Sequence, residues 1–142
     1  MRLKNATMYE ITIERTFVAT HALRHYKGGT EPSHEHSWRV WITVGGSELN
    51  PAGCIVDFHE IADWFDHAVA NWRGQNLNVI PPFTEGNLGL SPSAENVART
   101  IYDSIVPLIP KTTRLIRVEV EEETGCRAAY QGIESGGVLQ CP

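Results

Sequence analysis

Along this chain, apolar residues first recur at every second position, then at the three- and four-residue spacing of a helix, and finally at every second position again. Apolar and polar residues alternate over 9–17 and 38–44, which predicts strands with one buried face. Over residues 58–72 and 94–108, apolar residues recur every three or four positions, which predicts helices with one apolar stripe. Alternation returns over 115–122. The helices therefore lie between two groups of strands.

A short apolar segment at 128–130 completes the pattern as a second C-terminal strand. The order ββααββ predicts an α+β fold, with an antiparallel four-stranded sheet and two helices on one of its faces. Asp57, followed by Glu60, has the spacing of a helix N-cap. The length predicts a single domain over residues 1–142.

Charge and apolar content exclude two classes of partner. The net charge of −5 argues against nucleic acid, because duplex binding depends on phosphate neutralisation. No stretch approaches the ~20 apolar residues of a membrane helix, so no membrane association is expected. The three cysteines, at 54, 126 and 141, have no metal-binding spacing and predict free thiols in a cytoplasmic protein. Cys54 is expected as a small buried residue on a strand before the first helix.

All six histidines lie between His21 and His67. His34 and His36 are two residues apart, so a strand places both imidazoles on one face. His21 continues the buried face of the first strand and joins them if the two strands pair. Three histidines with an open fourth position are typical of a catalytic zinc site. The residues alone leave open that these are ordinary hydrogen-bonded histidines; the other three, His25, His59 and His67, are expected to have no role.

Six short segments, in the same order along residues 9–132, resemble motifs of the 6-pyruvoyltetrahydropterin synthase and 6-carboxytetrahydropterin synthase family. Each motif is short, and it is the whole set that is specific. The segments are Phe17-Val18-Ala19-Thr20-His21, His34-Glu35-His36, Gly53-Cys54-Ile55-Val56-Asp57-Phe58, Leu77-Asn78, Ser91-Pro92-Ser93-Ala94-Glu95-Asn96, and Glu122 eight residues before Tyr130.

This resemblance implies the tunnelling fold, in which trimers close an antiparallel barrel and two trimers stack as a hexamer. It implies zinc held by His21, His34 and His36, and a pterin-like small molecule as substrate. Glu122 and Ser93 would contact that substrate. A homo-oligomer, trimer or hexamer, is expected on the same ground.

The acid that would bind the heterocycle is ambiguous, because the literal Glu-Thr pair of the family falls here at Glu123-Thr124. Strand alternation favours Glu122, which continues the face of Val118 and Val120. A carboxylate on a buried face needs hydrogen-bond donors, and the N–H groups of a pterin would supply them.

The chain departs from the family at three places. Thr30 stands where the synthases have a cysteine before the histidine pair, Arg73-Gly74 stands where they have Asp-His, and Glu35 replaces a glycine. Glu31 instead gives the pattern Glu-x-x-His-x-His, which resembles a branch of the family that cleaves the side chain of dihydroneopterin triphosphate. Beside a zinc-bound oxygen, such a carboxylate can move a proton.

The sequence therefore predicts a zinc-dependent carbon–oxygen or carbon–carbon lyase with Glu31 as general base. It would act by retro-aldol cleavage or elimination on a dihydropterin or a related polyol or carbonyl substrate. Two alternatives remain: the same zinc scaffold condensing or cyclising a non-pterin aldehyde, and a non-catalytic homologue that binds a pterin-like ligand. The first is motivated by the absence of the Asp-His pair and by Glu35 in place of glycine, and the second by the loss of two catalytic elements of the family, the cysteine and the Asp-His pair.

Overall fold

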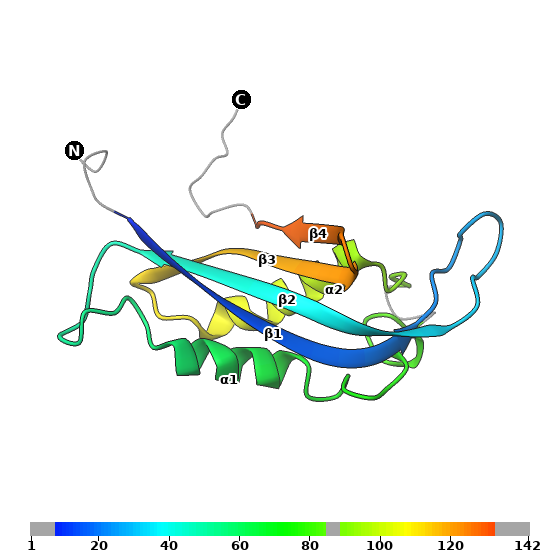
Figure 1. The fold of residues 1–142 in the computed structure, drawn as a ribbon, viewed down its shortest axis with the longest axis horizontal. Coiled ribbons are helices and arrows are strands. Elements are labelled where there is room, and N and C mark those ends of the chain that lie inside the picture. Colours follow the sequence, from blue (N-terminus) through cyan, green and yellow to red (C-terminus); the bar gives the residue numbers. More distant parts are fainter. Residues whose placement is uncertain (1–7, 85–88, 133–142) are drawn as a thin grey trace, which may run out of the picture.

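In the computed structural model, which describes residues 8–84 and 89–132, four antiparallel strands form one sheet in the order β1-β2-β3-β4. The strands are β1 (Tyr9–His21), β2 (His34–Gly46), β3 (Thr113–Glu123) and β4 (Cys126–Tyr130). Helices α1 (Phe58–Ala68) and α2 (Ala94–Ile105) connect the two hairpins, with short 3-10 turns η2 (Leu77–Val79) and η3 (Val106–Leu108). The expected ββααββ order is confirmed (Figure 1).

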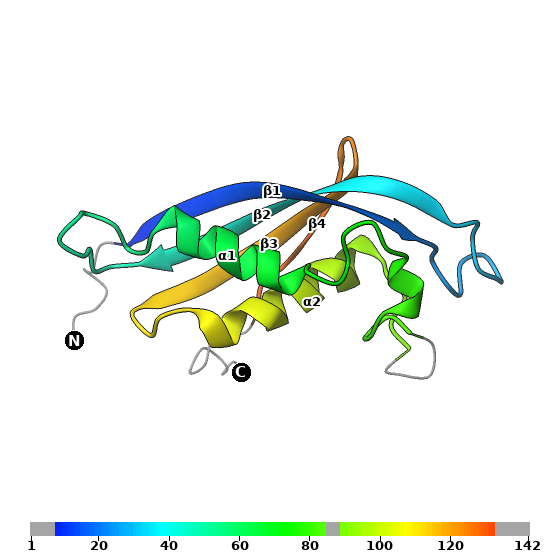
Figure 2. The same cartoon turned by 90° about the horizontal axis from the view of Figure 1, so that it is seen from below.

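Both helices cover one face of the sheet, and the core lies between the two layers (Figure 2). Alternation places Phe17, Trp38 and Val40 on that face, where Phe65 of α1 and Ile101 of α2 are also buried. The opposite sheet face carries charged side chains such as those of Glu14, Arg39 and Arg127, which are linked in ion pairs. A sheet buried on one face explains why the sequence alternates so regularly.

The register of the first hairpin sets the position of the histidines. Phe17 pairs with Trp38, and the last residue of β1, His21, pairs with the first residue of β2, His34. Because the two strands pair over their whole length, residues 21, 34 and 36 share one end and one face of the sheet. The expected face is therefore confirmed for all three histidines.

The helix starts are largely as expected. Asp57 is the N-cap of α1 and its Oδ1 accepts a hydrogen bond from the His59 amide at 2.8 Å. Ser93 caps α2 in the same way, its Oγ accepting from the Asn96 amide at 3.1 Å. Phe58 does not join the apolar face, because its side chain, in the first residue of α1, is 53% exposed.

The segment before α1 differs from the expectation of a strand. Ile55 and Val56 are buried, but the chain bends there and pairs with no strand of the described residues. Asn50 holds this loop, its Oδ1 accepting from the amides of Ala52 and Cys54. Cys54, in the same loop, is exposed rather than buried as expected.

The two helices that the structure describes are 11 and 12 residues long, and neither is long and apolar enough to cross a membrane.

Candidate metal centre

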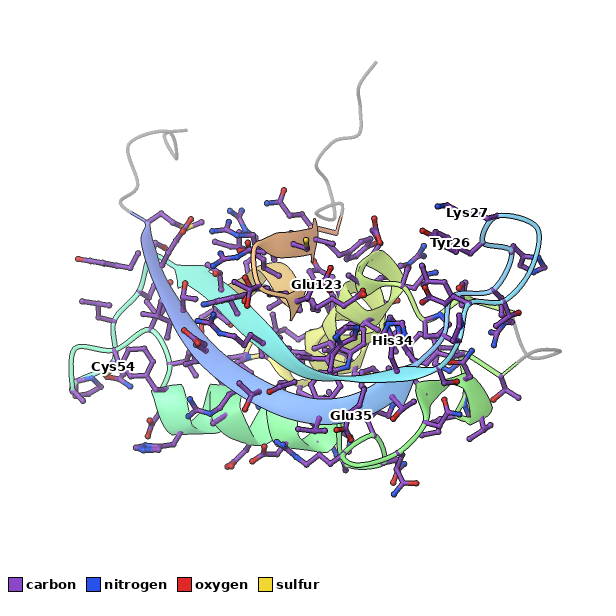
Figure 3. All side chains as sticks on the ribbon, turned by 45° about the vertical axis from the view of Figure 1, so that its right-hand side comes forward. Tyr26, Lys27, His34, Glu35, Cys54 and Glu123 are labelled. Atoms are coloured by element: carbon purple, nitrogen blue, oxygen red, sulfur yellow. The ribbon has the colours of Figure 1, made fainter. Side chains whose placement is uncertain are left out.

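His21, His34, His36 and Glu122 converge at the end of the sheet where β1 ends and β2 begins. One ligand atom from each of the four lies within 4.8 Å of all the others. The side chain of His21 is fully buried, and those of His36 and Glu122 are 14% and 23% exposed. His34 is the most accessible, at 38% (Figure 3). The sequence-predicted ligands are thus brought together, with a carboxylate beside them.

Backbone carbonyls fix the orientation of two of these rings. His21 Nδ1 lies 2.7 Å from the carbonyl oxygen of Pro92, and His34 Nδ1 lies 2.9 Å from that of Pro32. A carbonyl oxygen only accepts, so each Nδ1 carries the proton and donates it. In the neutral ring each Nε2 then keeps its lone pair, which is directed at the cluster as in metal-ligating histidines.

The Nε2 atoms of His21 and His34 are 3.1 Å apart. Two lone pairs at this distance repel each other unless a proton or a metal ion lies between them. His36 Nε2 is buried and, among the described residues, has no hydrogen-bond partner. A metal ion would account for both observations, because it accepts lone pairs from several imidazole nitrogens at once. The residues present therefore fit a metal of the zinc type.

The charges within the cluster are strongly coupled. Burial lowers the pKa of His21, but the contacts of its ring with Glu122 and with the Pro92 carbonyl outweigh burial and raise the pKa above its usual value. Contact with His21 in turn lowers the pKa of Glu122 below its usual value. Burial lowers the pKa of His36. Glu122 is therefore ionised at neutral pH, and its negative charge lies beside imidazole nitrogens that can bind a cation.

Glu31, the predicted base, lies at the rim of the cluster. Its Oε2 is 3.8 Å from His34 Nε2 and accepts a hydrogen bond from the Leu23 amide at 3.0 Å. The Glu31 amide donates to the Leu23 carbonyl, also at 3.0 Å, so backbone and side chain both bind residue 23. The side chain is 18% exposed. This arrangement fixes one carboxylate oxygen beside the histidine cluster.

The two acids whose roles the sequence left ambiguous lie in different surroundings. Glu122 Oε2 is 3.4 Å from His21 Nε2 and 3.3 Å from His36 Nε2. Glu123 is exposed at the end of β3, where its carboxylate lies 4.0 Å from Cys126 Sγ (Figure 3). Of the two, only Glu122 faces the histidines.

The remaining predicted residues lie outside the cluster. Ser93 immediately follows Pro92 but its hydroxyl caps α2. Glu35 is exposed and, by strand alternation, lies on the opposite sheet face from His34 (Figure 3). His25, His59 and His67 are exposed, and Cys141 lies outside the described residues.

The position where the family has Asp-His is used structurally. Arg73 donates to the Thr16 carbonyl and to Asp66, and the amide of Gly74 donates to the Val18 carbonyl at 2.7 Å. These hydrogen bonds attach the segment to β1. They leave no acid–base side chain at residue 74.

Asn78 is a residue of the site that sequence reasoning left without a role. Its Oδ1 accepts from the Ala22 amide at 2.9 Å, and its Nδ2 donates to the Ala22 carbonyl at 2.8 Å. It thereby holds the residue that follows His21. Its place in the Leu77-Asn78 motif was the signal available.

Comparison with known proteins gives consistent matches. The family model described as 6-pyruvoyl tetrahydropterin synthase matches residues 10–133. The 6-carboxy-5,6,7,8-tetrahydropterin synthase of Bacillus subtilis is 29% identical over 102 residues, which are 68% of this chain and 65% of that protein. The chain thus matches slightly less than two thirds of the length of this relative.

Two solved structures share the fold. The Caenorhabditis elegans 6-pyruvoyl tetrahydropterin synthase superposes with a TM-score of 0.71 at 17% identity, covering 89% of this chain and 97% of that one. The Plasmodium vivax 6-pyruvoyltetrahydropterin synthase, in a variant whose catalytic glutamate is replaced by alanine, gives 0.65 at 14% identity, covering 87% and 97%. The expected tunnelling-fold architecture of the subunit is confirmed by these likenesses.

Proposed function

Because the chain belongs to the 6-pyruvoyl tetrahydropterin synthase family, we propose that it is a zinc-dependent lyase acting on a dihydropterin or a related polyol or carbonyl substrate. One observation carries the proposal: three imidazoles converge with their Nε2 atoms together, and a carboxylate held by the backbone lies 3.8 Å from one of them. A metal and a base side by side suit retro-aldol cleavage or elimination.

His21, His34 and His36 would hold the metal. A bound zinc ion supplies Lewis-acid polarisation of a hydroxyl or carbonyl oxygen of the substrate. The two proline carbonyls keep the rings of His21 and His34 in the tautomer that leaves Nε2 available. Burial of His21 and His36 excludes water from one side of the position.

Glu31 is the general base of the proposed reaction. In a retro-aldol cleavage its carboxylate takes the proton of a substrate hydroxyl, the carbon–carbon bond breaks, and the electron pair passes to the carbon fragment. The protonated Glu31 then returns the proton to that carbon. The hydrogen bond from the Leu23 amide keeps Oε2 in place for both steps. The Plasmodium vivax protein of the same fold also has a glutamate described as catalytic.

The other proposed contacts are those of the substrate and of further subunits. Glu122 and Ser93 remain our predicted substrate-binding residues. Glu122 Oε2 lies 3.4 Å from His21 Nε2, and Ser93 follows Pro92, whose carbonyl accepts a hydrogen bond from His21. We place the protein in the cytoplasm as a homo-oligomer, a trimer or hexamer. The sheet edges formed by β1 and β4 are the surfaces through which subunits would pair. Light scattering of the purified protein tests the assembly.

The base is tested by Glu31→Gln, with Glu35→Gln as the matched control. Both remove one carboxylate from the same loop-to-strand segment, but Glu35 lies on the opposite sheet face. With dihydroneopterin triphosphate as substrate, we expect Glu31→Gln to lower kcat by about 100-fold or more while zinc content stays stoichiometric. Full activity of Glu31→Gln contradicts the assignment, and absence of divalent metal from the native protein contradicts the whole proposal.

A second candidate keeps the metal and changes the substrate. Arg73 and Gly74 form structural hydrogen bonds at the position where the synthases have Asp-His, which favours a different reaction, such as condensation or cyclisation of a non-pterin aldehyde. Clean conversion of dihydroneopterin triphosphate to a hydroxymethylpterin eliminates this candidate. Tight binding of a pterin without chemical change supports a non-catalytic homologue instead.

A further inference from the structure

Glu122 lies in a β-bulge of β3, on the sheet face that carries the histidines. Along β3 and β4, Glu121 pairs with Arg127 and Glu123 pairs with Cys126, so Glu122 has no partner in the ladder. Val120 pairs with Val40, so two residues further along β3, Glu122 comes level with Trp38, whose ring stacks edge-on against His21 and His36. The carboxylate therefore reaches the core face exactly where the cluster lies.

Neighbours on the other face of the sheet fix this bulge. Glu121 accepts a hydrogen bond from the Gly125 amide at 2.9 Å and pairs with Arg39 at 3.0 Å. These contacts hold the residue before Glu122 and the turn that follows it. Glu122 is thus presented by a constrained backbone rather than by a free strand end.

The surroundings of Glu122 Oε2 are those of a metal ligand. The atom lies 3.3–3.4 Å from the Nε2 atoms of His21 and His36. His21 Nδ1 already donates to Pro92, and His36 Nε2 has no hydrogen-bond partner among the described residues. Three neutral imidazoles and one carboxylate are a donor set that zinc accepts in four-coordinate sites.

We propose that Glu122 is a fourth protein ligand of the metal in the substrate-free protein, completing a three-histidine, one-carboxylate site. The inference rests on the proposed function, because it presupposes that the histidines hold a metal. The sequence predicted three histidine ligands and an open fourth coordination position; in this inference, Glu122 occupies that position instead of water. A substrate oxygen must then displace Glu122, which frees the carboxylate for the N–H groups of the heterocycle.

The test compares Glu122→Gln with Glu123→Gln, its exposed neighbour. Metal-free protein is titrated with Zn²⁺ against a chromophoric chelator and, separately, with Co²⁺, whose visible absorption depends on the number and type of its ligands. We expect Glu122→Gln to weaken Zn²⁺ binding by at least about tenfold and to change the Co²⁺ spectrum. Glu123→Gln should match the wild-type protein in both measurements.

A second variant shows whether weaker metal binding results from loss of the carboxylate or from loss of folding. In Glu122→Ala, added formate should restore the wild-type Co²⁺ spectrum, because the small carboxylate fills the vacated position. Unchanged Zn²⁺ affinity and an unchanged Co²⁺ spectrum in Glu122→Gln overturn the inference and leave a three-histidine enzyme intact. Failure of the wild-type protein to bind either metal overturns the inference and the proposed function together.

Discussion

Two prolines determine what the histidine cluster can bind, although neither contributes a side-chain ligand. Proline carbonyls accept hydrogen bonds from His21 and His34, and the acceptor decides which ring nitrogen keeps a lone pair. Since Pro32 lies two residues from His34 and Pro92 lies 71 residues from His21, one ring is oriented locally and the other by the tertiary fold. The α2 N-terminus is therefore part of the site.

Another residue-scale effect is the pH dependence of the cap at Asp57. The His59 amide lowers the pKa of this carboxyl below its ordinary value of 3.8. A depressed pKa in the folded state means that the stabilisation is present above the unfolded value and is lost as the pH falls through the folded one. We expect Asp57→Ala to lower the Tm at pH 7, and the difference from wild type to narrow as the pH falls below about 4, because the protonated carboxyl keeps only the weaker, uncharged cap.

Asp57→Asn is the control for this titration. An amide oxygen also caps a helix but carries no charge in this range. The Tm difference between Asp57→Asn and Asp57→Ala should therefore persist in acid. Thermal unfolding followed by circular dichroism between pH 3 and 7 measures all three proteins; a wild-type advantage that is unchanged at pH 3 contradicts the prediction.

The ligand face could be predicted from the sequence, whereas the contacts of Glu122 could not. Alternation is a fixed geometric property of strands, so it placed His21, His34 and His36 on one face as soon as β1 and β2 paired. The same rule favoured Glu122 over Glu123. Its distance from the imidazoles depends on the register between β2 and β3, which the residue pattern of a single strand does not encode.

At the scale of the elements, the segment that leaves β1 is held from two sides. Asn78 of η2 binds both backbone groups of Ala22, and Glu31 binds both backbone groups of Leu23. His21, one of the proposed metal ligands, precedes these residues directly. Residues 21–23 thus link the histidine cluster to the predicted base, Glu31, and to the distant 3-10 turn η2.

Asn78→Ala should therefore affect metal binding as well as stability. Losing two backbone hydrogen bonds of a part-buried amide is expected to cost about 1–3 kcal/mol of the free energy of unfolding. Because Ala22 then loses its fixed position, we expect Zn²⁺ affinity to fall by roughly tenfold. Chemical denaturation and a chelator competition titration measure the two effects.

Asn50→Ala separates a specific effect from general destabilisation. Asn50 also makes two side-chain hydrogen bonds to the backbone, accepting both, but in the loop at the opposite end of the sheet (Figure 1). It should lower stability and leave Zn²⁺ affinity unchanged. Equal Zn²⁺ affinity in Asn78→Ala and wild type would show that Asn78 does not position His21.

Secondary structure was hardest to predict where a residue is buried without belonging to a strand, or belongs to a helix without being buried. Ile55 and Val56 are buried, and a pair of buried β-branched residues favours a strand in sequence; in the structure they belong to a bent loop whose hydrogen bonds go to Asn50 instead. Phe58 shows the opposite case, an apolar residue at a helical position whose side chain is exposed. Both lie at the entry to α1, where loop geometry decides orientation.

In the whole molecule, the cluster joins parts of the chain that no single element connects. Its side chains come from β1, β2 and β3, and the Pro92 carbonyl links it to the start of α2. A ligand that binds only the folded state stabilises every element it connects. The metal is therefore expected to stabilise the fold as a whole rather than only the end of the sheet.

Metal removal tests this coupling. With free zinc at about 100 times its dissociation constant, binding contributes about 2.7 kcal/mol, which corresponds to a rise in Tm of roughly 5–10 °C for a chain of this size. We expect a chelator to lower the Tm of the wild-type protein by this amount and to leave that of His36→Ala almost unchanged, because the variant has lost a ligand. Differential scanning calorimetry, with the metal content measured on the same samples, gives the answer: a wild-type Tm that does not move after complete removal of the metal means that the cluster does not link the three strands energetically.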